Sequence, residues 1–516
     1  MPGKRSGTMM RRKAKRAALA ALLAAAALLL GGCAGQIEER PMADLSAVEI
    51  PAGAEAPLAD GADDVELEVK LYFLGADGTT LVPVSRRITA RGGESRVQAA
   101  LSALLAGPME GETGVFWPEM GTARSARQLE VSSGVATVDL PADAQMLAQE
   151  VLYAVRLAIA NTLTEFAEVS YVNVLIGGSE EGFDLGGTLP VGTVTRTEDM
   201  DTGTRYHRMD EQRLSGDGVT LMTTLYFPAA DGGFVLPEVR NVRYQHAAPI
   251  EYLYTLLEEI GKGTNNPLAS RDVPAPLDYI REMPEIVRTE DGAYRAIEIR
   301  FTDALNDALA WAGLTRGVYM AMLTDTLMGF VPGVEGLKVS IGDEEITGLG
   351  AAHAPDGQEM EFVQPLATRG DFGGYIGAPA ALYAREENGD GLIRISCTLR
   401  QALADDPRER LTGLMRLGED ETAYALPSGI DESDILAVHV GETVIAVNLS
   451  AKFRRQLEML EPNAERAAVY AMVNTLTEGM GSRRVAFFFE GKQVERLAGA
   501  LEMRGTFMRN PGMVVN

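Results

Sequence analysis

The sequence is poor in the residues from which metal and redox sites are built. Its 516 residues include only four histidines and two cysteines. No His-x-x-x-His or Glu-x-x-His spacing is present, so we expect no zinc site, and nothing else in the sequence indicates a cofactor. The four histidines, each solitary in the chain, are His207, His246, His353 and His439.

Motifs that mark common active sites are also missing. The chain has no Gly-x-Ser-x-Gly elbow, no phosphate-binding Gly-x-x-x-x-Gly-Lys loop and no dinucleotide fingerprint. Carboxylates do occur side by side, as in Glu258-Glu259, Asp343 to Glu345 and Asp405-Asp406. In a chain this acidic we interpret them as solvated surface. The sequence therefore predicts no catalytic residue, and we expect a protein that is not an enzyme.

Basic residues are few, and the N-terminus concentrates them. Seven lysines and arginines lie between residues 4 and 16, ahead of an apolar run over residues 17–30 and then Gly31-Gly32-Cys33. This order is typical of a secretory signal. The run is short for a spanning helix, which needs roughly 20 apolar residues, and Leu-Gly-Gly-Cys resembles the lipobox of bacterial lipoproteins. We predict a signal peptide over residues 1–32 and lipidation of Cys33; an uncleaved anchor with an incidental cysteine is the alternative.

These features predict a location outside the cytoplasm, at the bacterial cell membrane. Several acyl chains on Cys33 would hold the mature chain where a single chain would not. Without the signal, 40 Lys and Arg oppose 73 Asp and Glu, a net charge of −33. Nucleic acids and anionic polymers demand clustered basic residues, so we expect no nucleic-acid partner. Residues 33–64, rich in Ala, Pro, Glu and Asp, are predicted to form a disordered acidic tether.

With Cys33 lipidated, Cys397 is the one remaining thiol, so the fold cannot rely on an internal disulfide. Cys397 lies in the alternating segment 392–398, which is typical of a strand. We therefore expect a buried structural thiol instead of a nucleophile.

One pattern of apolar segments occurs three times. Each copy has an apolar strand and its partner, a helix ending near a glycine, a hairpin, a long helix and a last strand. The copies are marked by Leu71-Tyr72-Phe73 with residues 161–166, Leu225-Tyr226-Phe227 with residues 324–327, and Ala381-Leu382-Tyr383 with residues 474–478. Each copy is of ordinary domain size, about 120 to 150 residues, so we interpret them as three separate beads.

The order of elements in each copy is ββαββαβ. Helices on one face of a small mixed sheet bury both amphipathic surfaces in two layers, so the predicted class is α+β with tandem two-layer modules. We expect the copies at residues 65–200, 216–345 and 379–516, with a linker over 346–378. Because Gly348 to Gly374 is rich in Gly, Ala, Pro and Asp, we expect the third copy to be loosely joined.

Short polar residues recur at fixed places in the copies. Thr162, Thr326 and Thr475 stand near the end of the long helix, where a hydroxyl commonly bonds a preceding carbonyl. A second set closes the strand before that helix, where a short side chain can satisfy free backbone amides. Its members are Asp139, Asp303 and Asn448. We interpret both sets as architecture and not as binding sites.

These segments together resemble the GerMN domain family. The resemblance is carried by the Leu-Tyr-Phe strand, a Val-Pro partner strand with Arg86-Arg87, the Leu-Leu-x-Gly-Pro helix end, Val138-Asp139-Leu140 and the Asn-Thr-Leu-Thr-Glu-Phe helix end. It is strongest over Val65 to Arg196, weaker over Leu221 to Gly342 and weakest over Ala381 to Asn516. The tail from Gly187 to Arg196 is echoed by Gly499 to Arg509.

The resemblance implies an extracytoplasmic lipoprotein of spore-forming bacteria that acts in sporulation and germination. Its domains are expected to be similar to the ring-building motifs of secretion machines, and to contact engulfment or channel components of the envelope. The family pattern has two copies, whereas this sequence has three.

We therefore predict a non-enzymatic, membrane-anchored lipoprotein whose sheet edges or helix faces contact envelope or sporulation proteins. A protein that binds peptidoglycan or spore cortex between its copies is the first alternative. Carbohydrate sites favour exposed aromatics, and of Trp117 and Trp311 we expect the second on a buried helical face. A cortex-lytic hydrolase is the other alternative, and it requires carboxylates from separate copies to converge in a cleft.

Overall fold

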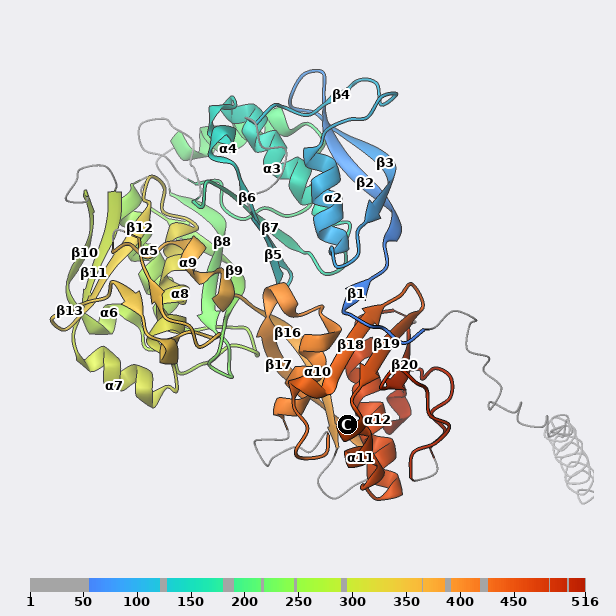
Figure 1. The fold of residues 1–516 in the computed structure, drawn as a ribbon. Helices are drawn as coiled ribbons and strands as arrows, with labels where there is room; N and C mark the ends of the chain where they lie inside the picture. The colour runs from blue at the N-terminus through green and yellow to red at the C-terminus, as the bar shows by residue number, and fades with distance from the viewer. Residues whose placement is uncertain are drawn as a thin grey trace, which may run out of the picture. The chain divides into compact units, whose positions relative to one another are not determined.

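The computed structural model describes most of the chain beyond residue 54 (Figure 1). The described residues are 55–120, 128–179, 190–214, 218–245, 248–288, 295–363, 365–385, 391–417, 426–481, 483–498 and 501–515. The predicted signal peptide, Cys33, residues 33–54 of the predicted tether and His246 lie outside these ranges. Among the helices of the described ranges, none is both long and apolar enough to cross a bilayer.

The first part, which we call module 1, begins with a long hairpin. Its elements are β2 (Val65–Gly75), β3 (Leu81–Ala90), α2 (Arg96–Leu105), β4 (Val115–Phe116), β5 (Gln128–Ser132), β6 (Val135–Leu140), η1 (Ala142–Met146), α3 (Gln149–Leu163), β7 (Tyr171–Ile176) and α4 (Thr202–Leu214). Tyr206 of α4 packs into the same core as α3, so this core extends past the boundary predicted at residue 200.

Module 2 repeats the plan and adds several short elements. They are β8 (Val219–Pro228), β9 (Val235–Tyr244), α5 (Pro249–Gly261), α6 (Pro276–Tyr279), β10 (Ile280–Arg288), β11 (Arg295–Phe301), α7 (Ala304–Trp311), α8 (Arg316–Met328), β12 (Gly336–Ile341), β13 (Glu344–Glu345), β14 (Gly348–Leu349), η2 (Ala351–His353), β15 (Met360–Glu361), α9 (Arg369–Phe372) and η3 (Gly373–Tyr375).

Module 3 has the same order of elements and borrows one strand from the start of the described chain. Its elements are β16 (Gly377–Arg385), β17 (Leu392–Arg400), η4 (Gln401–Leu403), α10 (Pro407–Arg416), η5 (Glu432–Asp434), β18 (Ile435–Val440), β19 (Val444–Leu449), α11 (Ala451–Glu458), α12 (Pro462–Thr477), β20 (Arg484–Phe489) and η6 (Pro511–Met513). The borrowed strand is β1 (Gly61–Ala62), which pairs with β18.

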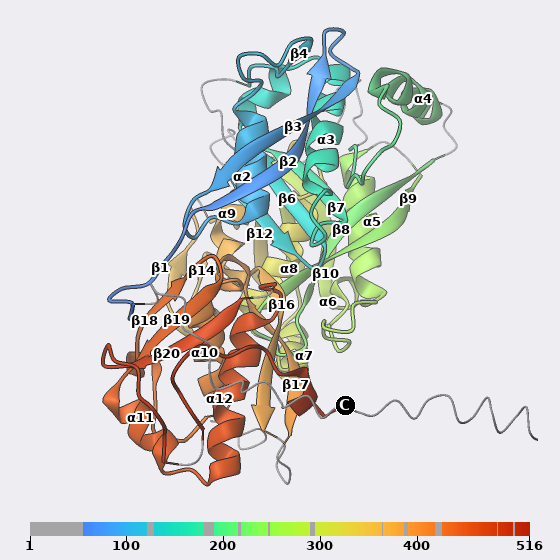
Figure 2. The ribbon, with the colours of Figure 1, turned by 90° about the vertical axis from the view of Figure 1, so that its right-hand side faces the viewer.

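In each module a long helix packs against two separate sheets, and module 2 has a further two-stranded sheet, β14–β15. The first is the antiparallel hairpin β2–β3, β8–β9 or β16–β17; the second holds a parallel pair, β6–β7, β11–β12 or β19–β20, with an antiparallel neighbour. The long helices α3, α8 and α12 contact a strand of each sheet (Figure 2). The α+β class is therefore confirmed, but the single sheet expected in each copy is wrong, because the helix lies against two sheets.

The long helices are buried on all sides for most of their length. In α3 every residue from Leu152 to Leu163 is buried, and in α8 every residue from Gly317 to Met328. A helix that is apolar all round belongs in an interior. The sequence predicted amphipathic helices on a single sheet, and the wider burial follows from the second sheet covering the opposite face.

The recurrent threonines join the long helix to the hairpin. The amide of Tyr72 donates to Thr162 Oγ1 at 3.0 Å. The same bond joins Tyr226 to Thr326 at 2.9 Å and Tyr383 to Thr475 at 3.1 Å. At these tyrosines the strand has no strand neighbour on this edge, since β4 reaches β2 only at Leu74 and Gly75, so the outward amide needs another acceptor. These hydroxyls therefore accept a hydrogen bond from an amide of another element. The sequence predicted a bond to a preceding carbonyl and did not predict this amide partner.

The opposite register position in the hairpin fits the same bond. Pro83 stands opposite Tyr72 and Pro237 stands opposite Tyr226. Because the tyrosine amide donates to the helix, this pair needs no hydrogen bond across the hairpin, and a residue without an N–H is tolerated there.

The second recurrent polar set also serves backbone amides. Asp139 Oδ1 accepts from the amide of Gly178 at 2.8 Å, and Asn448 Oδ1 accepts from that of Gly491 at 2.9 Å. Both amides lie just after the parallel neighbour strand, not in the following helix. Asp303 occupies the N-cap place of α7 without a side-chain capping bond. Asp139 and Asn448 therefore have architectural roles, as expected. The amides that they bind follow the neighbouring strand and do not belong to the following helix.

Residues 55–64, predicted as the end of the tether, are instead part of module 3. Strand β1 lies beside β18 in Figure 1 and pairs with it in parallel. Asp60 accepts from Arg408 Nε at 2.6 Å, and Asn448 Nδ2 donates to the carbonyl of Pro57 at 3.1 Å. The acidic residues that predicted disorder in this segment include Asp60, whose carboxylate binds Arg408.

The predicted linker over 346–378 is also folded. Leu349, Phe372 and Tyr375 are buried in the core of module 2. The interpretation of a loose joint is therefore wrong, because these apolar residues pack against the second core despite the many glycines around them.

We predict that the helix-to-hairpin bond can be measured in module 3. Thr475→Val keeps the shape of the side chain but leaves the buried Tyr383 amide without an acceptor, which should lower the free energy of unfolding by about 1–3 kcal/mol in urea titrations. Thr477→Val is the matched control, because Thr477 Oγ1 donates to the carbonyl of Val473 within the same helix. A loss for Thr475→Val no larger than that of the control would contradict the assignment.

Candidate functional site

The three modules meet at the outer face of the β5–β6 hairpin. Strand β6 contacts β9 of module 2, and β5 contacts β16 of module 3. Ser132 Oγ donates to the carbonyl of Gly377, and the hydroxyls of Thr193 and Thr224 lie 2.7 Å apart. Residues 54–516 form one compact unit. The prediction of three separate beads is therefore wrong, because polar side chains on the outer faces of the modules bond one another.

A buried arginine lies at this junction. Arg369 Nη2 is 3.3 Å from Glu130 Oε2 of module 1, and its Nη1 is 3.1 Å from Asp325 Oδ1 of α8. The guanidinium lies over the ring of Tyr226 at 5.4 Å and donates to its hydroxyl at 3.4 Å. Thr137 Oγ1 lies 3.3 Å from that hydroxyl. We call these five residues the Arg369 cluster.

The charges of the Arg369 cluster are held almost wholly out of water. Glu130 is 7% exposed and Asp325 is 1% exposed. Burial raises the pKa of Asp325 to about 8 and also raises that of Glu130, against the opposing effect of Arg369. Burial opposes the charge of Arg369 as well, but its acidic neighbours raise its pKa. Two carboxylates thus face one guanidinium, and we infer that Asp325 keeps a proton while Glu130 is the counter-ion.

Modules 1 and 3 hold the corresponding arginine with a carboxylate of their own. Each stacks its guanidinium on the Leu-Tyr-Phe or Ala-Leu-Tyr tyrosine with the ring centroid at 5.6 Å. The groups are Arg196, Tyr72 and Glu165 in module 1, and Arg509, Tyr383 and Glu478 in module 3. The two arginines end the tail segments whose echo the sequence revealed.

Module 2 lacks that carboxylate. Glu165 and Glu478 each stand three residues after the recurrent threonine, and the same place after Thr326 is Gly329. A Cβ on Gly329 would lie 3.6 Å from Arg369 Nη1, so the missing side chain would have been beside the guanidinium. Glu130 of module 1 supplies the charge instead. The neutralisation of a buried arginine thereby depends on a neighbouring module.

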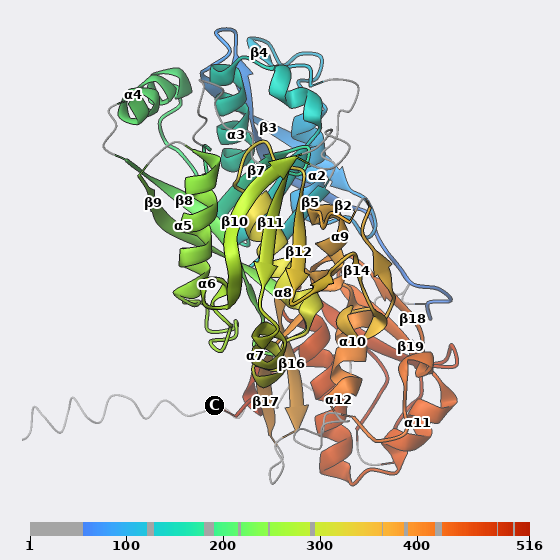
Figure 3. The same ribbon diagram turned by 90° about the vertical axis from the view of Figure 1, so that its left-hand side faces the viewer.

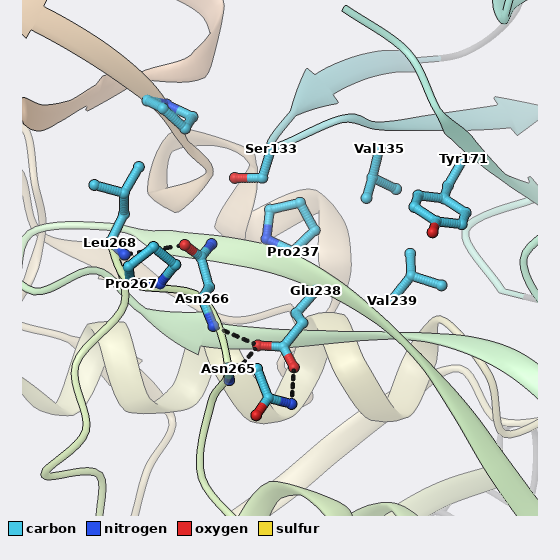
Figure 4. Close-up of a pocket in the computed structure, with 11 residues that line it drawn as sticks. Ser133, Val135, Tyr171, Pro237, Glu238, Val239, Asn265, Asn266, Pro267 and Leu268 are labelled. Carbon is cyan, nitrogen blue, oxygen red and sulfur yellow. Dashed lines mark hydrogen bonds between the residues drawn. The ribbon is translucent and has the colours of Figure 1, made fainter. Parts of the chain in front are cut away.

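Beside this junction is an open cleft of about 430 Å³ (Figure 4). All three modules contribute to its lining. The lining residues are Ser133, Val135 and Tyr171 of module 1, Pro237, Glu238, Val239, Asn265, Asn266, Pro267 and Leu268 of module 2, and Pro379 of module 3.

The carboxylate in the lining of the cleft, Glu238, is already engaged. Glu238 accepts from Thr264 Oγ1 at 2.6 Å, from the Asn265 amide at 2.9 Å and from Arg240 Nε at 2.6 Å. Burial raises the pKa of Glu238, but the hydrogen bonds from Arg240 and Thr264 outweigh it and the pKa is lowered. A carboxylate held ionised by this many donors is a poor general acid. The cleft offers proline, aliphatic and amide surface suited to binding.

Carboxylates from separate copies do converge, at Glu130 and Asp325. They meet in a buried ion cluster and not in the cleft, so a sugar could not reach them as hydrolysis requires. Asp343 and Asp405, from the paired carboxylates of the sequence, are highly exposed and salt-bridged to Arg281 and Arg410. The solvated interpretation of those two is confirmed.

The described histidines lie apart from one another. His207 is 3.3 Å from Glu150 and His439 is 2.9 Å from Asp63, while His353 lies in η2. Within the described ranges, no three His, Cys, Asp or Glu side chains gather in a way that could hold a metal ion.

Cys397 and Trp311 differ in how well the sequence placed them. Cys397 lies in β17, half-buried, and burial raises the pKa of its thiol to about 11, which disfavours a nucleophilic thiolate. Trp311 is 95% exposed, so its predicted burial is wrong. The buried face of α7 carries Leu305 and Leu309, and a residue two places further on points roughly 200° away from Leu309.

Two regions of the chain match the model of a known family. Residues 70–182 and 387–495 match Germane, described as sporulation and spore germination. These two regions are similar to Germane domains. They coincide with modules 1 and 3; residues of module 2 lie outside both matches, although the sequence resemblance ranked module 2 above module 3. Comparison with curated proteins gives no match.

Solved structures are similar to parts of the chain. The tandem GerMN domains of the sporulation protein GerM from Bacillus subtilis are 14% identical, covering 58% of this chain and all of that one, with a TM-score of 0.21. The first GerMN domain of the same protein is 22% identical over 26% of this chain and 99% of that one, at 0.20. A putative lipoprotein from Clostridium perfringens is 17% identical over 28% and 92%, at 0.17.

We predict that the Arg369 cluster makes the stability of the protein fall as pH rises. The pKa of Asp325 is about 8 in the folded protein against an ordinary 3.8, so the folded state holds a proton that the unfolded chain releases near pH 4. This stabilisation is complete below about pH 4 and is lost as pH rises toward 8.

Asp325→Asn mimics the protonated side chain and should remove this component. Its free energy of unfolding, measured in urea at pH 5 and pH 8, should fall less over that interval than that of the unaltered protein. Identical pH dependence for both proteins would show that Asp325 does not carry the proton.

Proposed function

We propose that this protein is a non-enzymatic, membrane-anchored lipoprotein that acts in sporulation or spore germination through protein contacts in the cell envelope. The observation that carries the proposal is the junction of the modules. Its charged groups neutralise one another and its cleft carboxylate is saturated with donors, so the site offers a surface and no reactive group. The two Germane regions support the biological setting.

The anchor is part of the proposal. The lipobox-like Leu30 to Cys33 supports lipidation of Cys33 and a location outside the cytoplasm. The described chain then begins on module 3, where Asp60 binds Arg408. We propose a tether from Cys33 to about residue 54, shorter than the sequence predicted, because residues 55–64 belong to module 3.

We further propose that module 2 is a third, diverged GerMN-like domain related to ring-building motifs. The support is the shared Tyr-to-Thr bond and a shared arginine on the hairpin. Arg86 lies over Phe73 at 5.2 Å and Arg240 lies over Phe227 at 4.9 Å. Each also donates to a carbonyl near the end of the following helix at 3.2 Å. The domain boundaries then follow the core clusters, at about residues 65–214, 218–376 and 377–516.

Peptidoglycan or spore-cortex binding is the second candidate. The exposed indole of Trp311 favours it, since sugar rings stack on exposed aromatic faces. A single exposed tryptophan is a smaller platform than the three-module junction, so we rank it below protein contacts.

The experiment that tests the proposal is crosslinking and pull-down of the lipidated protein from sporulating cells. We expect envelope or engulfment proteins to be recovered, and we expect them to be lost from a Cys33→Ala variant that cannot be anchored. A Trp311→Ala variant, whose change lies on the surface, should recover the same proteins.

Recovery of peptidoglycan fragments alone, and their loss with Trp311→Ala, would overturn the proposal in favour of the second candidate. Recovery of the same proteins with Cys33→Ala would contradict the anchored mode of action.

A further inference from the structure

The contact between modules 1 and 2 shows what a tyrosine–arginine site of this chain accepts. The site on module 2 consists of Tyr226 and of Arg369, whose guanidinium lies over the ring. The outer face of the β5–β6 hairpin covers this site. The hairpin contributes a carboxylate, Glu130, from its first strand and a hydroxyl, Thr137, from its second. Glu130 and Thr137 are directly opposite each other in the strand register.

Module 3 presents a site of the same kind that is open to solvent. Arg509 lies over Tyr383 at 5.6 Å, and both bond Glu478. Arg394, opposite Tyr383 in the hairpin, lies 3.3 Å from the same carboxylate. The side chains of Arg394 and Arg509 are 48% and 39% exposed. Two guanidiniums share one carboxylate, which leaves a positive charge on the surface of a strongly acidic protein.

Module 2 presents a hairpin face that matches the one used by module 1. In both modules the parallel pairing runs to the last residue of the first strand, which is Leu140 in β6 and Phe301 in β11. Counting three residues back from these equivalent ends gives Thr137 in module 1 and Glu298 in module 2. Glu298 lies opposite Glu285 in the register, so Glu285 occupies the place of Glu130.

This hairpin face is uncovered by other described elements and is rich in carboxylates. In Figure 3 the strands β10, β11 and β12 face the viewer, in front of α8. Glu285 is exposed. Arg300 and Lys338 lie 3.2 Å and 3.8 Å from Glu298, and Arg300 also lies 2.6 Å from Glu282 of β10. These cations offset the charge of Glu298, so Glu285 is the exposed carboxylate of the pair that a cationic surface can bind.

We propose that the β10–β11 face of one copy of this protein docks on the Tyr383–Arg509–Arg394 site of a second copy. The inference rests on the proposed function only in treating module surfaces as protein-contact surfaces. Glu285 and Glu298 take the places of Glu130 and Thr137, and Arg394 supplies the fork that a carboxylate binds with two hydrogen bonds. The contact joins unlike surfaces, so each copy offers one of each and the association can extend beyond a pair.

The test is sedimentation velocity of the whole chain beyond the predicted signal, with Cys33→Ser to prevent lipidation, over a range of concentrations at low salt. We expect a weight-average mass that rises with concentration and falls as salt is added, because the contact is between charges. Glu285→Arg should weaken the association at least tenfold, since a like-charge contact at an interface costs several kcal/mol.

Two further variants make the assignment specific. Glu66→Arg makes the same charge change on an exposed strand position of module 1 and should leave the association unchanged. The double variant Glu285→Arg with Arg394→Glu exchanges the two charges and should restore association toward that of the unaltered chain.

A monomer at all concentrations would overturn the proposal, as would equal effects of Glu285→Arg and Glu66→Arg or failure of the double variant to recover. None of these results bears on capture of other envelope proteins from sporulating cells, so the two proposals fail separately.

Discussion

The buried guanidinium of Arg369 constrains how the first two modules sit together. A charge of this kind in an apolar interior must be neutralised and hydrogen-bonded, because an unpaired one costs several kcal/mol. Module 2 cannot do so with a side chain at residue 329, which is glycine, and it recruits Glu130 from module 1. Separation of the modules would leave Arg369 facing Asp325, whose proton would have to be released at neutral pH. The polar cluster thereby makes the orientation of two modules specific in a way that an apolar contact would not.

The same bond between the long helix and the hairpin occurs in all three modules. A hairpin strand with a free edge is satisfied by a threonine of the long buried helix, and a distant arginine then closes over the tyrosine of that strand. Where a glutamate three residues after the threonine binds the arginine, the site remains open to solvent. Where that carboxylate is missing, another module covers the site. The difference between a surface site and a buried joint thus comes from one position, three residues after the threonine.

The sequence predicted the repeated elements well, because alternation and helical periodicity are local signals. It identified Thr162 and Asp139 as recurrent, and it found the echo that ends in Arg196 and Arg509. It did not reveal that Thr162 accepts from Tyr72, because this depends on which edge of the hairpin faces the helix. Nor could it locate Glu130 beside Arg369, since that contact spans 239 residues and two modules.

Predictions drawn from composition were wrong for two segments, because a few specific contacts determine their structure. The acidic segment 55–64 lacks the apolar content of a core element, yet Asp60 and the backbone of Pro57 fix it on module 3. The glycine-rich stretch before module 3 folds because Phe372 and Tyr375 reach the second core. The burial of Trp311 was misjudged because its place on α7 depends on the direction in which Leu305 and Leu309 point.

The most direct test of this account is a double-mutant cycle between Glu130 and Arg369, with Glu130→Gln, Arg369→Met and the pair together, measured by urea unfolding at pH 7. The account predicts a coupling energy of about 1.5 kcal/mol or more, because each side chain is the buried counter-ion of the other. Additive effects, with a coupling within about 0.5 kcal/mol of zero, would show that the modules are held together by other contacts and would contradict the central role given to this pair.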